Sequence, residues 1–471
     1  CFGCGKGGDA IAFVQEKNGC DFQQSVEEIA KCCSVPIEYV KSDKTDEQII
    51  ADKRREAMSI ALEQVQTFFV RQLSVNNPES EKASNYAYGR WPQDFCIKAG
   101  IGYSPYSSDL LVKFCESKSI DKDILLQLGV LARGEDGSVF SLLRGRITIP
   151  IFNRVNKLIG FTARTIGNSN IKYLNLPNSA VFNKSESVFG INIAARSAKE
   201  KGFLILVEGA PDVLRLQSIG LTNAIATLGT AWSEKHFDAI KPLASSLCFI
   251  PDSDTPKGGN VFGAGFLAVM KNGAEAMRRG FDVTVRELPF GTDADGKPTK
   301  NDADCFINSA ETFYHLQEKH FVVWLAEKRF PQATTLRQTR ETVTEISSLL
   351  SLIDDRLLFD ECIEQLTKVY GKPKMWRDAC ANAKAQRLGQ ERQLMQVEYA
   401  EPTLKDLLKK FNLYIRNNMY FSAAEDEPVR LSNFILEPMY HIKDDSNGTR
   451  IFKIRNEYNV EEVVEFREAE L

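Results

Sequence analysis

The chain has 471 residues, 43% of them hydrophobic and 26% charged, and a formal net charge of −4 at pH 7. At roughly 100 to 200 residues per domain this length predicts three or four globular units, and no apolar run approaches the roughly 20 residues that a membrane helix requires. A slightly acidic chain is also not one that coats nucleic acid indiscriminately, because such binding relies on clustered Lys and Arg.

The cysteines favour a reducing compartment. The chain has 11 of them, scattered and without a preceding secretory signal, so we expect reduced thiols and a cytoplasmic protein. Only Cys1 and Cys4, in Cys-Phe-Gly-Cys, have the spacing of a pair of metal ligands. Because the chain starts with Cys rather than Met, we expect its start to be cut or processed.

Residues 1–81 are expected to form two small units. Residues 1–40 read as a module that opens with the cysteine pair and continues as an amphipathic stretch. Residues 41–81 are charged and helix-prone, which predicts a helical linker. Four apolar residues of this linker recur at alternating steps of four and three and so share one helical face: Met58, Leu62, Val65 and Phe69.

Residues 82–200 mix short helical patterns with strand patterns such as 146–151 and 157–161, which predicts an α+β lobe. Residues 137–185 of this lobe contain no Asp or Glu. Their basic residues are Arg144, Arg146, Arg154, Lys157, Arg164, Lys172 and Lys184. A run of charge is often a solvated surface, but the interleaving of this one with strand and turn residues favours an anionic partner.

Residues 201–310 alternate short apolar runs with helical stretches, which predicts a parallel sheet with crossover helices and a ligand site at its strand ends. The apolar runs are 203–207, 224–227, 247–250 and 283–288. Residues 311–399 lack strand signals and repeat apolar positions at helical spacing, so we expect a helical subdomain. Residues 400–471 look like the edge of another α/β unit, the start of a further domain of unknown function.

Carboxylates follow three of the four apolar runs. In chain order the pairs are Glu208 with Asp212, Asp252 with Asp254, and Asp302 with Asp304. Mg²⁺ needs hard oxygen ligands, and two such ions commonly hold the attacking and leaving oxygens of a nucleotidyl transfer. Any single pair is more often a set of turn or cap residues, but three pairs at neighbouring strand ends favour a two-metal site.

The segment between the last apolar run and the third pair holds two competing signals. Asp293 and Asp295 are rivals for the third acidic pair. The stretch 291–297 has the spacing of a phosphate-binding Walker A loop, but Pro298 stands where that motif requires Ser or Thr. We therefore do not expect an ATP-binding loop here.

The three acidic pairs resemble the toprim fold of bacterial primases, topoisomerases and related nucleases, where a Glu ends the first strand and Asp-x-Asp motifs end later ones. The resemblance implies that Glu208 is a metal ligand or general base and that Asp252 and Asp254 are the core metal ligands, which makes these three the candidate catalytic residues. The implied Mg²⁺ or Mn²⁺ ligands are completed by Asp212, Asp302 and Asp304. The last pair is preferred to its rivals because Cys-Phe-Ile and a helix follow it, as in the family.

The basic lobe resembles the polymerase domain of DnaG-type bacterial primases. The matching segments are 143–147, 160–164, 172–175 and 182–184. Family members hold template or nucleotide with basic residues in this region. The resemblance implies a nucleic-acid or nucleotide interface that contains Arg90, Arg144, Arg146, Arg164, Lys172 and Lys184.

The opening residues resemble the second half of the zinc ribbon found at the start of such primases. Cys1 and Cys4 would then be half of a four-ligand site, with Zn²⁺ as a cofactor of the intact module. The family's other two ligands, a Cys and a His, would lie before Cys1.

These resemblances imply an α/β and α+β multidomain protein with an α+β primase lobe, a toprim parallel-sheet domain and a helical subdomain. They imply a DNA primase that makes short RNA primers on single-stranded DNA from ribonucleoside triphosphates, works with a replicative helicase and needs no membrane. The chain also resembles the primase part of a phage or mobile-element replication protein. Two alternatives remain: a toprim-type nuclease, which would not require the basic lobe, and a non-catalytic DNA-binding module, which would not require all six carboxylates.

Overall fold

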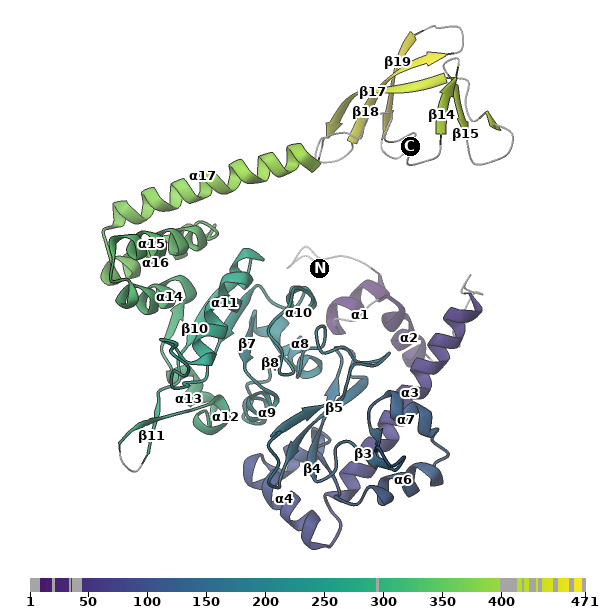
Figure 1. Cartoon of the computed structure of the whole chain (residues 1–471). Helices are drawn as coiled ribbons and strands as arrows, with labels where there is room; N and C mark the ends of the chain where they lie inside the picture. Colours follow the sequence, from purple (N-terminus) through teal and green to yellow (C-terminus); the bar gives the residue numbers. More distant parts are fainter. Residues whose placement is uncertain are drawn as a thin grey trace. The chain divides into compact units, whose positions relative to one another are not determined.

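A computed structural model describes residues 9–18, 22–33, 35, 45–293 and 296–398, and the strand segments 413–416, 419–422, 429–430, 434–443, 448–456 and 461–467. The chain divides into two compact units, Cys1–Ala383 and Lys384–Leu471 (Figure 1). Among the described helices, none combines the length and the apolar character needed to cross a membrane.

The first unit begins with five helices. These are α1 (Ala10–Asn18), α2 (Phe22–Cys33), α3 (Asp46–Gln72), α4 (Pro78–Arg90) and α5 (Gln93–Lys98). The α3 helix starts at Thr45, whose hydroxyl accepts the backbone N–H of Gln48 in a capping box. The four apolar residues expected on one face of this helix are at most 3% exposed and belong to the core of the neighbouring lobe. The helix expected within 41–81 is therefore packed into that lobe.

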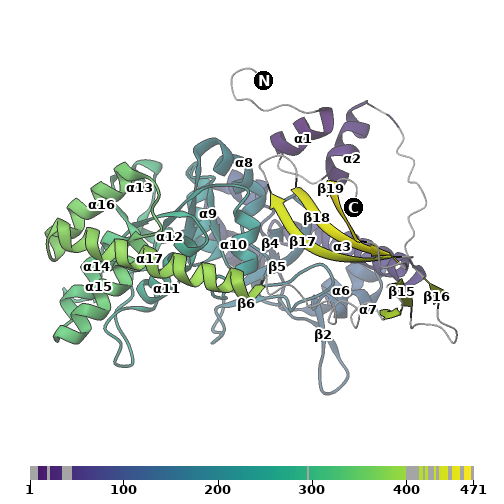
Figure 2. The ribbon, with the colours of Figure 1, turned by 90° about the horizontal axis from the view of Figure 1, so that it is seen from above.

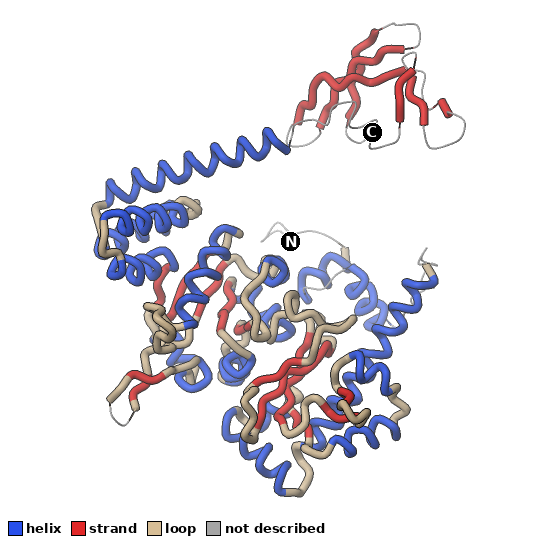
Figure 3. Tube along the Cα trace, viewed as in Figure 1, coloured by secondary structure: helices blue, strands red, loops and turns tan. Residues whose placement is uncertain are grey.

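An antiparallel sheet of four strands forms the centre of the lobe (Figure 3). Its order is β1 (Gly102–Ser104), β4 (Arg146–Phe152), β5 (Leu158–Thr165) and β6 (Tyr173–Asn175). One face packs on α3 through Phe161 and Ala163, and a Cβ atom on Gly102 would lie 2.6 Å from the backbone of Phe69, so only glycine allows this close approach. The other face, with Ile147 and its alternate neighbours, shares a core with the next sheet.

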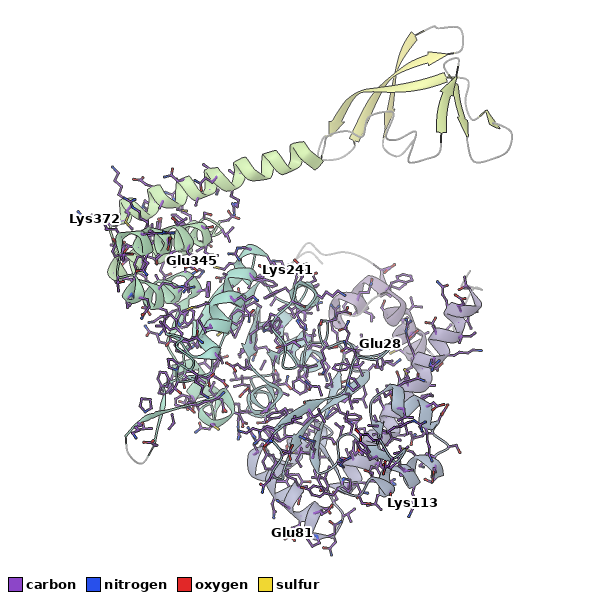
Figure 4. The ribbon with its side chains drawn as sticks, viewed as in Figure 1. Glu28, Glu81, Lys113, Lys241, Glu345 and Lys372 are labelled. Atoms are coloured by element: carbon purple, nitrogen blue, oxygen red, sulfur yellow. The ribbon has the colours of Figure 1, made fainter. Side chains whose placement is uncertain are left out.

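Smaller elements close the outer side of this lobe. They are α6 (Ser108–Ser117), α7 (Lys122–Gln127), β2 (Leu131–Arg133) and β3 (Val139–Ser141). Glu81 on α4 and Lys113 on α6 mark its exposed edge (Figure 4). The helix α8 (Ile191–Lys201) then leads into the second sheet.

The second sheet has five strands in the order β13, β10, β9, β7, β8. Four of them are parallel: β7 (Phe203–Val207), β8 (Ala224–Ala226), β9 (Ser246–Phe249) and β10 (Asp282–Arg286). The crossovers contain α9 (Ala210–Ser218), α10 (Glu234–Ile240) and α11 (Ala264–Arg278). Successive residues of β7 enter different cores, Leu204 and Leu206 on one face and Ile205 and Val207 on the other, so the sheet is covered on both sides.

The edge strand β13 (Glu318–His320) corrects the expectation that residues 311–399 contain only helices. It pairs antiparallel with β10 through the register Thr284 to His320. An edge strand of this length is held by backbone pairing and does not need apolar side chains. Its three residues, Glu-Lys-His, therefore lack the apolar pattern from which a strand is predicted.

Short elements and a helical group complete the first unit. The short elements are β11 (Gly291–Thr292), β12 (Pro298–Thr299), α12 (Ala303–Phe306), α13 (Ala310–His315) and η1 (Phe330–Gln332). The helices are α14 (Phe321–Arg329), α15 (Leu336–Leu350), α16 (Arg356–Val369) and the first part of α17 (Pro373–Glu398), which continues into the second unit. Figure 2 shows α14, α15 and α16 gathered together. Trp324 on α14 and Trp376 on α17 are fully buried and belong to the core on one face of the parallel sheet.

In the second unit, the described segments beyond residue 398 are all strands. One antiparallel sheet contains β14 (Leu413–Arg416), β15 (Met419–Ser422) and β16 (Val429–Arg430). Another contains β17 (Phe434–Lys443), β18 (Gly448–Asn456) and β19 (Glu461–Arg467). Over these segments the antiparallel pairing replaces the α/β edge expected from the sequence.

Candidate active site

A cavity of about 1110 Å³ lies between the basic lobe and the carboxyl ends of the parallel strands. Its walls on the lobe side come from α4, β5 and β6. On the sheet side they come from the residues that follow β7, β8 and β9 and from the segment 300–305. The order of strands in the parallel sheet places these loops side by side, because β7 pairs with both β8 and β9.

Three carboxylates gather next to β7 and β9. Glu208, Asp252 and Asp254 each present an oxygen, and these oxygens all lie within 4.8 Å of one another. The backbone N–H of Asp252 donates to Glu208 Oε1 over 3.3 Å. A Cβ atom on Gly265 would lie 2.7 Å from the Asp252 carbonyl oxygen, so glycine allows α11 to start directly against this group. We call these three residues the acidic trio.

Lys300 is the cation of the acidic trio. Its Nζ lies 2.5 Å from Asp252 Oδ2 and 3.2 Å from Asp254 Oδ1, and its side chain is 50% exposed. Backbone contacts hold the two segments in register: Ser253 N–H donates to Asn301 O over 3.0 Å, and Asn301 N–H donates to Ser253 Oγ over 3.1 Å. The sequence did not indicate that this lysine belongs to the site, because nothing in its neighbourhood sets it apart from Lys297.

The other acidic residues form a second group around α12. Asp302 caps this helix by accepting the N–H of Cys305, and Asp302, Asp304 and Cys305 bring ligand atoms within 4.8 Å of one another. Asp212 lies behind them at 6% exposure, where its Oδ1 accepts the N–H of Asp304 and its Oδ2 accepts the N–H of Gly209. Asp212 therefore ties the loop after β7 to α12.

Two arginines pair with Asp304. The guanidinium of Arg90 meets Asp304 Oδ2 through two nitrogens, with Nε at 2.5 Å. Arg215 Nε donates to the Asp304 carbonyl oxygen over 3.0 Å and lies 3.4 Å from Oδ1. The Arg90 Nη1 also donates to the Tyr86 hydroxyl over 2.6 Å. Arg90 therefore joins α4 of the basic lobe to the acidic side of the cavity, and Arg215 is a further residue that the sequence did not indicate.

Burial makes the acidic groups costly to ionise. Burial, followed by the charge of Asp252, raises the pKa of Glu208 to about 7. Burial also raises the pKa of Asp252, and it raises the pKa of Asp212 well above its ordinary range with help from the charges of Asp252 and Asp302. Burial works against the charged form of Lys300, but its contacts with Asp252 and Asp254 outweigh this and raise its pKa. An excess of buried negative charge of this kind is relieved by cations.

The donor set fits divalent ions. Both groups offer carboxylate oxygens, the hard ligands that Mg²⁺ and Mn²⁺ prefer. The acidic trio has only the half-exposed Lys300 ammonium as a cationic partner among the described residues. Each group thus brings together the kind of ligand atoms that a divalent cation uses.

Half of the basic residues expected at the interface line the cavity. Arg90, Arg164 and Lys172 do so, and Arg164 lies over the ring of Tyr173, with 4.9 Å between its Cζ and the ring centroid. Tyr86 and Tyr173 line the same wall, which gives it an aromatic character that the sequence reasoning did not anticipate.

The other three basic residues lie elsewhere. Arg144 covers the ring of Phe140, and Lys184 is not part of the cavity lining. Arg146 is 8% exposed and donates to the carbonyl oxygens of Ile171 and Lys172 and to Ser169 Oγ. Its guanidinium therefore forms hydrogen bonds inside the lobe. We do not include Arg146 in the proposed nucleic-acid interface.

The competing segment before the third acidic pair forms a hairpin. β11 and β12 pair antiparallel, and Asp293 accepts the N–H of Lys297 over 2.8 Å within the turn. Asp293 does not line the cavity, whereas Asp302 and Asp304 do. Asp295 and the expected zinc ligands Cys1 and Cys4 lie outside the described residues.

Three family models match separate stretches of the chain. A CHC2 zinc finger matches residues 1–45, the DNA primase catalytic core, N-terminal domain, matches residues 68–195, and a Toprim-like domain matches residues 205–297. The second match contains Arg90, Arg164 and Lys172, and the third contains the acidic trio. Asp302 and Asp304 lie just beyond it.

Proteins named DNA primase are similar in sequence. The one from Staphylococcus aureus strain COL is 30% identical over 321 residues, which cover 67% of this chain and 52% of that protein. The one from Staphylococcus epidermidis is 26% identical over 378 residues, which cover 79% of this chain and 60% of that protein. The chain thus spans about half the length of the Staphylococcus aureus relative.

Solved structures share the fold. The zinc-binding and RNA polymerase domains of the Aquifex aeolicus primase are 27% identical with a TM-score of 0.54, and the match covers 80% of this chain and 85% of that one. A DNA primase domain from Pseudomonas aeruginosa is 24% identical with a TM-score of 0.56, and the match covers 69% and 99%. These likenesses confirm the α/β and α+β multidomain fold expected from the sequence.

Proposed function

Because the chain belongs to the DnaG-type family of DNA primases, we propose that it synthesises short RNA primers on single-stranded DNA by metal-dependent nucleotidyl transfer. The observation that carries this proposal is a cavity with one acidic wall and one wall that is basic and aromatic. Such a cavity suits a triphosphate and a growing strand, which need cations at the reacting phosphate and along the backbone.

The acidic residues have separate tasks in this proposal. Divalent ions, Mg²⁺ or Mn²⁺, held by the two groups would lower the pKa of the primer 3′-hydroxyl and offset the charge of the departing pyrophosphate. Glu208, Asp252 and Asp254 provide the ligands next to β7 and β9. Asp302 and Asp304 provide those next to α12, and Asp212 fixes the distance between the two groups through its backbone hydrogen bonds.

The basic side chains bind and orient the substrates. Arg164 and Lys172 neutralise phosphates of the template or the incoming nucleotide across from the acidic wall. Arg90 acts indirectly, because its guanidinium is engaged with Asp304 and thereby positions that carboxylate. Excluding water from so charged a cavity strengthens each of these interactions.

The family also guides our proposal for the substrates and partners. One related structure, at 22% identity, is a DnaG primase catalytic domain bound to single-stranded DNA. We extend this to propose a single-stranded DNA template, ribonucleoside triphosphates as substrates, a replicative helicase as partner and the cytoplasm as location. We likewise propose Zn²⁺ as a cofactor of the amino-terminal module, with Cys1 and Cys4 as two of its ligands.

Primer synthesis on defined single-stranded templates tests the proposal. With labelled ribonucleotides and Mg²⁺ or Mn²⁺, the protein should produce short, template-complementary RNA that depends on both template and metal. Degradation of the template without any RNA product would instead support the nuclease alternative. Template binding with neither product nor degradation would support the non-catalytic one.

A further inference from the structure

The side of α4 that faces the cavity has a gap. Three residues of this helix line the cavity: Tyr86, Gly89 and Arg90. Residues three and four positions apart share one face of a helix, so these three form a single stripe. Gly89 is exposed and has no side chain. The stripe therefore leaves open space between an aromatic side chain and a cationic one.

Nothing in the fold requires glycine at this position. Gly89 lies within α4 and does not have a positive φ, so any residue can adopt its backbone conformation. A Cβ atom on it would meet no atom of the described residues within 4 Å, the backbone of its own helix and its two chain neighbours aside. After proline, glycine is the poorest helix former. Position 89 therefore carries a residue that destabilises the helix without a packing or conformational reason.

Other glycines near the site do have such a reason. A Cβ atom on Gly102 or Gly265 would collide with backbone atoms, and Gly229, which also lines the cavity, has a φ of 72°. Among the described glycines whose φ is not positive, Gly89 is the only one whose Cβ would meet nothing within 4 Å. Packing and backbone conformation thus explain those three glycines but not Gly89.

Contacts on both sides hold the gap open. Arg90 Nη1 donates to the Tyr86 hydroxyl over 2.6 Å, and the Arg90 guanidinium also pairs with Asp304. Arg164 lies against the same tyrosine, with 5.6 Å between its Cζ and the ring centroid. Tyr86 and Arg90 are therefore fixed by their partners and do not fill the space over Gly89.

The charges around the gap favour the sugar of a nucleotide. Gly89 is the second-to-last residue of α4, and the last carbonyl groups of a helix carry partial negative charge and have no partner within the helix. Such a helix end opposes a phosphate and suits hydroxyl groups. Phosphates find cations at Arg164 and Lys172, which line the same cavity. The Tyr86 ring is in contact with the guanidinium groups of Arg90 and Arg164, so it is not free to stack on a base.

We propose that Gly89 is a sugar-contact position, where the pentose of a bound nucleotide packs against the helix backbone while its phosphates lie at Arg164 and Lys172. The pentose belongs to the incoming ribonucleotide or to the template strand, and the test below separates these two sources. This inference deepens the proposed function and rests on it. A sugar contact does not depend on the identity of the base, so it is compatible with template-directed selection of that base.

Gly89→Ala and Gly89→Gln test the contact, because both residues are better helix formers than glycine and only glutamine reaches far into the cavity. Both variants should raise the melting temperature by roughly 1–3 °C. Gly89→Gln should raise the dissociation constant for one of the two nucleotide sources about tenfold, and Gly89→Ala about two- to threefold, as for a side chain forced into a packed contact.

Asn85→Ala and Asn85→Gln are the matched controls. Asn85 is an exposed residue of α4 that does not line the cavity, and alanine and glutamine are better helix formers than asparagine. These two variants should also raise the melting temperature, but they should leave both dissociation constants unchanged. The controls therefore separate an effect of helix stability from an effect of the side chain in the cavity.

Fluorescence anisotropy with labelled single-stranded DNA and calorimetric titration with ATP and Mg²⁺ measure the two dissociation constants without catalysis. A loss confined to ATP in Gly89→Gln would assign the sugar to the incoming nucleotide, and a loss confined to DNA would assign it to the template.

The outcomes separate this inference from the proposed function. Equal dissociation constants of the wild type and Gly89→Gln for both ligands would overturn the sugar contact and leave primer synthesis to be judged by its own assay. A lower melting temperature of Gly89→Ala would also overturn it, because the fold would then require glycine. Weaker binding by Gly89→Gln in a protein that makes no primers would keep the sugar contact and reject the polymerase.

Discussion

Replacing Lys300 by methionine should tighten the binding of divalent metal. In the structure the Lys300 ammonium occupies the same carboxylates, Asp252 and Asp254, that we assign to the metal. A metal ion must therefore displace the ammonium before it binds. Methionine keeps the length of the side chain and removes this competitor.

The size of the effect follows from the two contacts. Lys300 is half exposed, so each ion pair is screened and contributes about 0.5–1 kcal/mol. Removing both should favour metal binding by roughly 1–2 kcal/mol, which corresponds to a dissociation constant for Mn²⁺ roughly 5 to 30 times lower. Without metal the same variant should melt at lower temperature, because the acidic trio loses its counter-ion.

Titration of free Mn²⁺ by electron paramagnetic resonance measures this constant without any substrate. Lys297→Met is the matched control, since Lys297 is an exposed lysine of the same segment and does not line the cavity. Unchanged or weaker Mn²⁺ binding in Lys300→Met would refute the reasoning, because it would mean that the ammonium and the metal do not compete for these oxygens.

Three further predictions concern the surroundings of the site. Arg90→Ala should lower the free energy of unfolding by roughly 1–3 kcal/mol, because it leaves the buried Asp304 with Arg215 alone. In a double-mutant cycle measured by urea denaturation, Asp304→Asn should recover part of this loss. Additive effects of the two substitutions on the free energy of unfolding would contradict the contact. Arg164→Ala and Lys172→Ala should each reduce the slope of log affinity for single-stranded DNA against log salt by roughly 0.7, whereas Arg146→Ala should lower the melting temperature and leave the slope unchanged. Burial lowers the pKa of His236 below its ordinary 6.5, so the folded state resists protonation and the free energy of unfolding should fall as pH drops below 6.5. His236→Gln can keep the side-chain contact that caps α10 and should flatten the dependence of the free energy of unfolding on pH in this range. Identical pH dependence in the wild type and the variant would show that His236 is not the titrating group.

The acidic wall could be predicted from the sequence because it depends on short stretches of consecutive residues. Runs such as 203–207 and 247–250 are apolar along their length, so they had to be buried parallel strands, and the residues directly after them had to meet at one edge of the sheet. The strand pattern therefore predicts that Glu208 and Asp252 lie close together, and in the structure they are in contact.

The remaining parts of the site depend on contacts between distant segments. Lys300 reaches carboxylates 46 and 48 positions earlier, and nothing in its own neighbourhood distinguishes it from Lys297. Arg146 belongs to a basic run, yet the pleat of β4 and the loop 169–172 direct its guanidinium to backbone carbonyl groups. Charge patterns identify which residues are cationic, but the fold decides which of them have already found a partner.

Metal-dependent primer synthesis by matched carboxylate variants tests the central claim most directly. Glu208→Gln and Asp252→Asn should retain the wild-type circular dichroism spectrum and lose template-directed incorporation of ribonucleotides, whereas Asp293→Asn, on the hairpin outside the cavity, should keep it. Incorporation at the wild-type rate by Asp252→Asn, or its loss in Asp293→Asn, would contradict the assignment of this cavity as the site of nucleotidyl transfer.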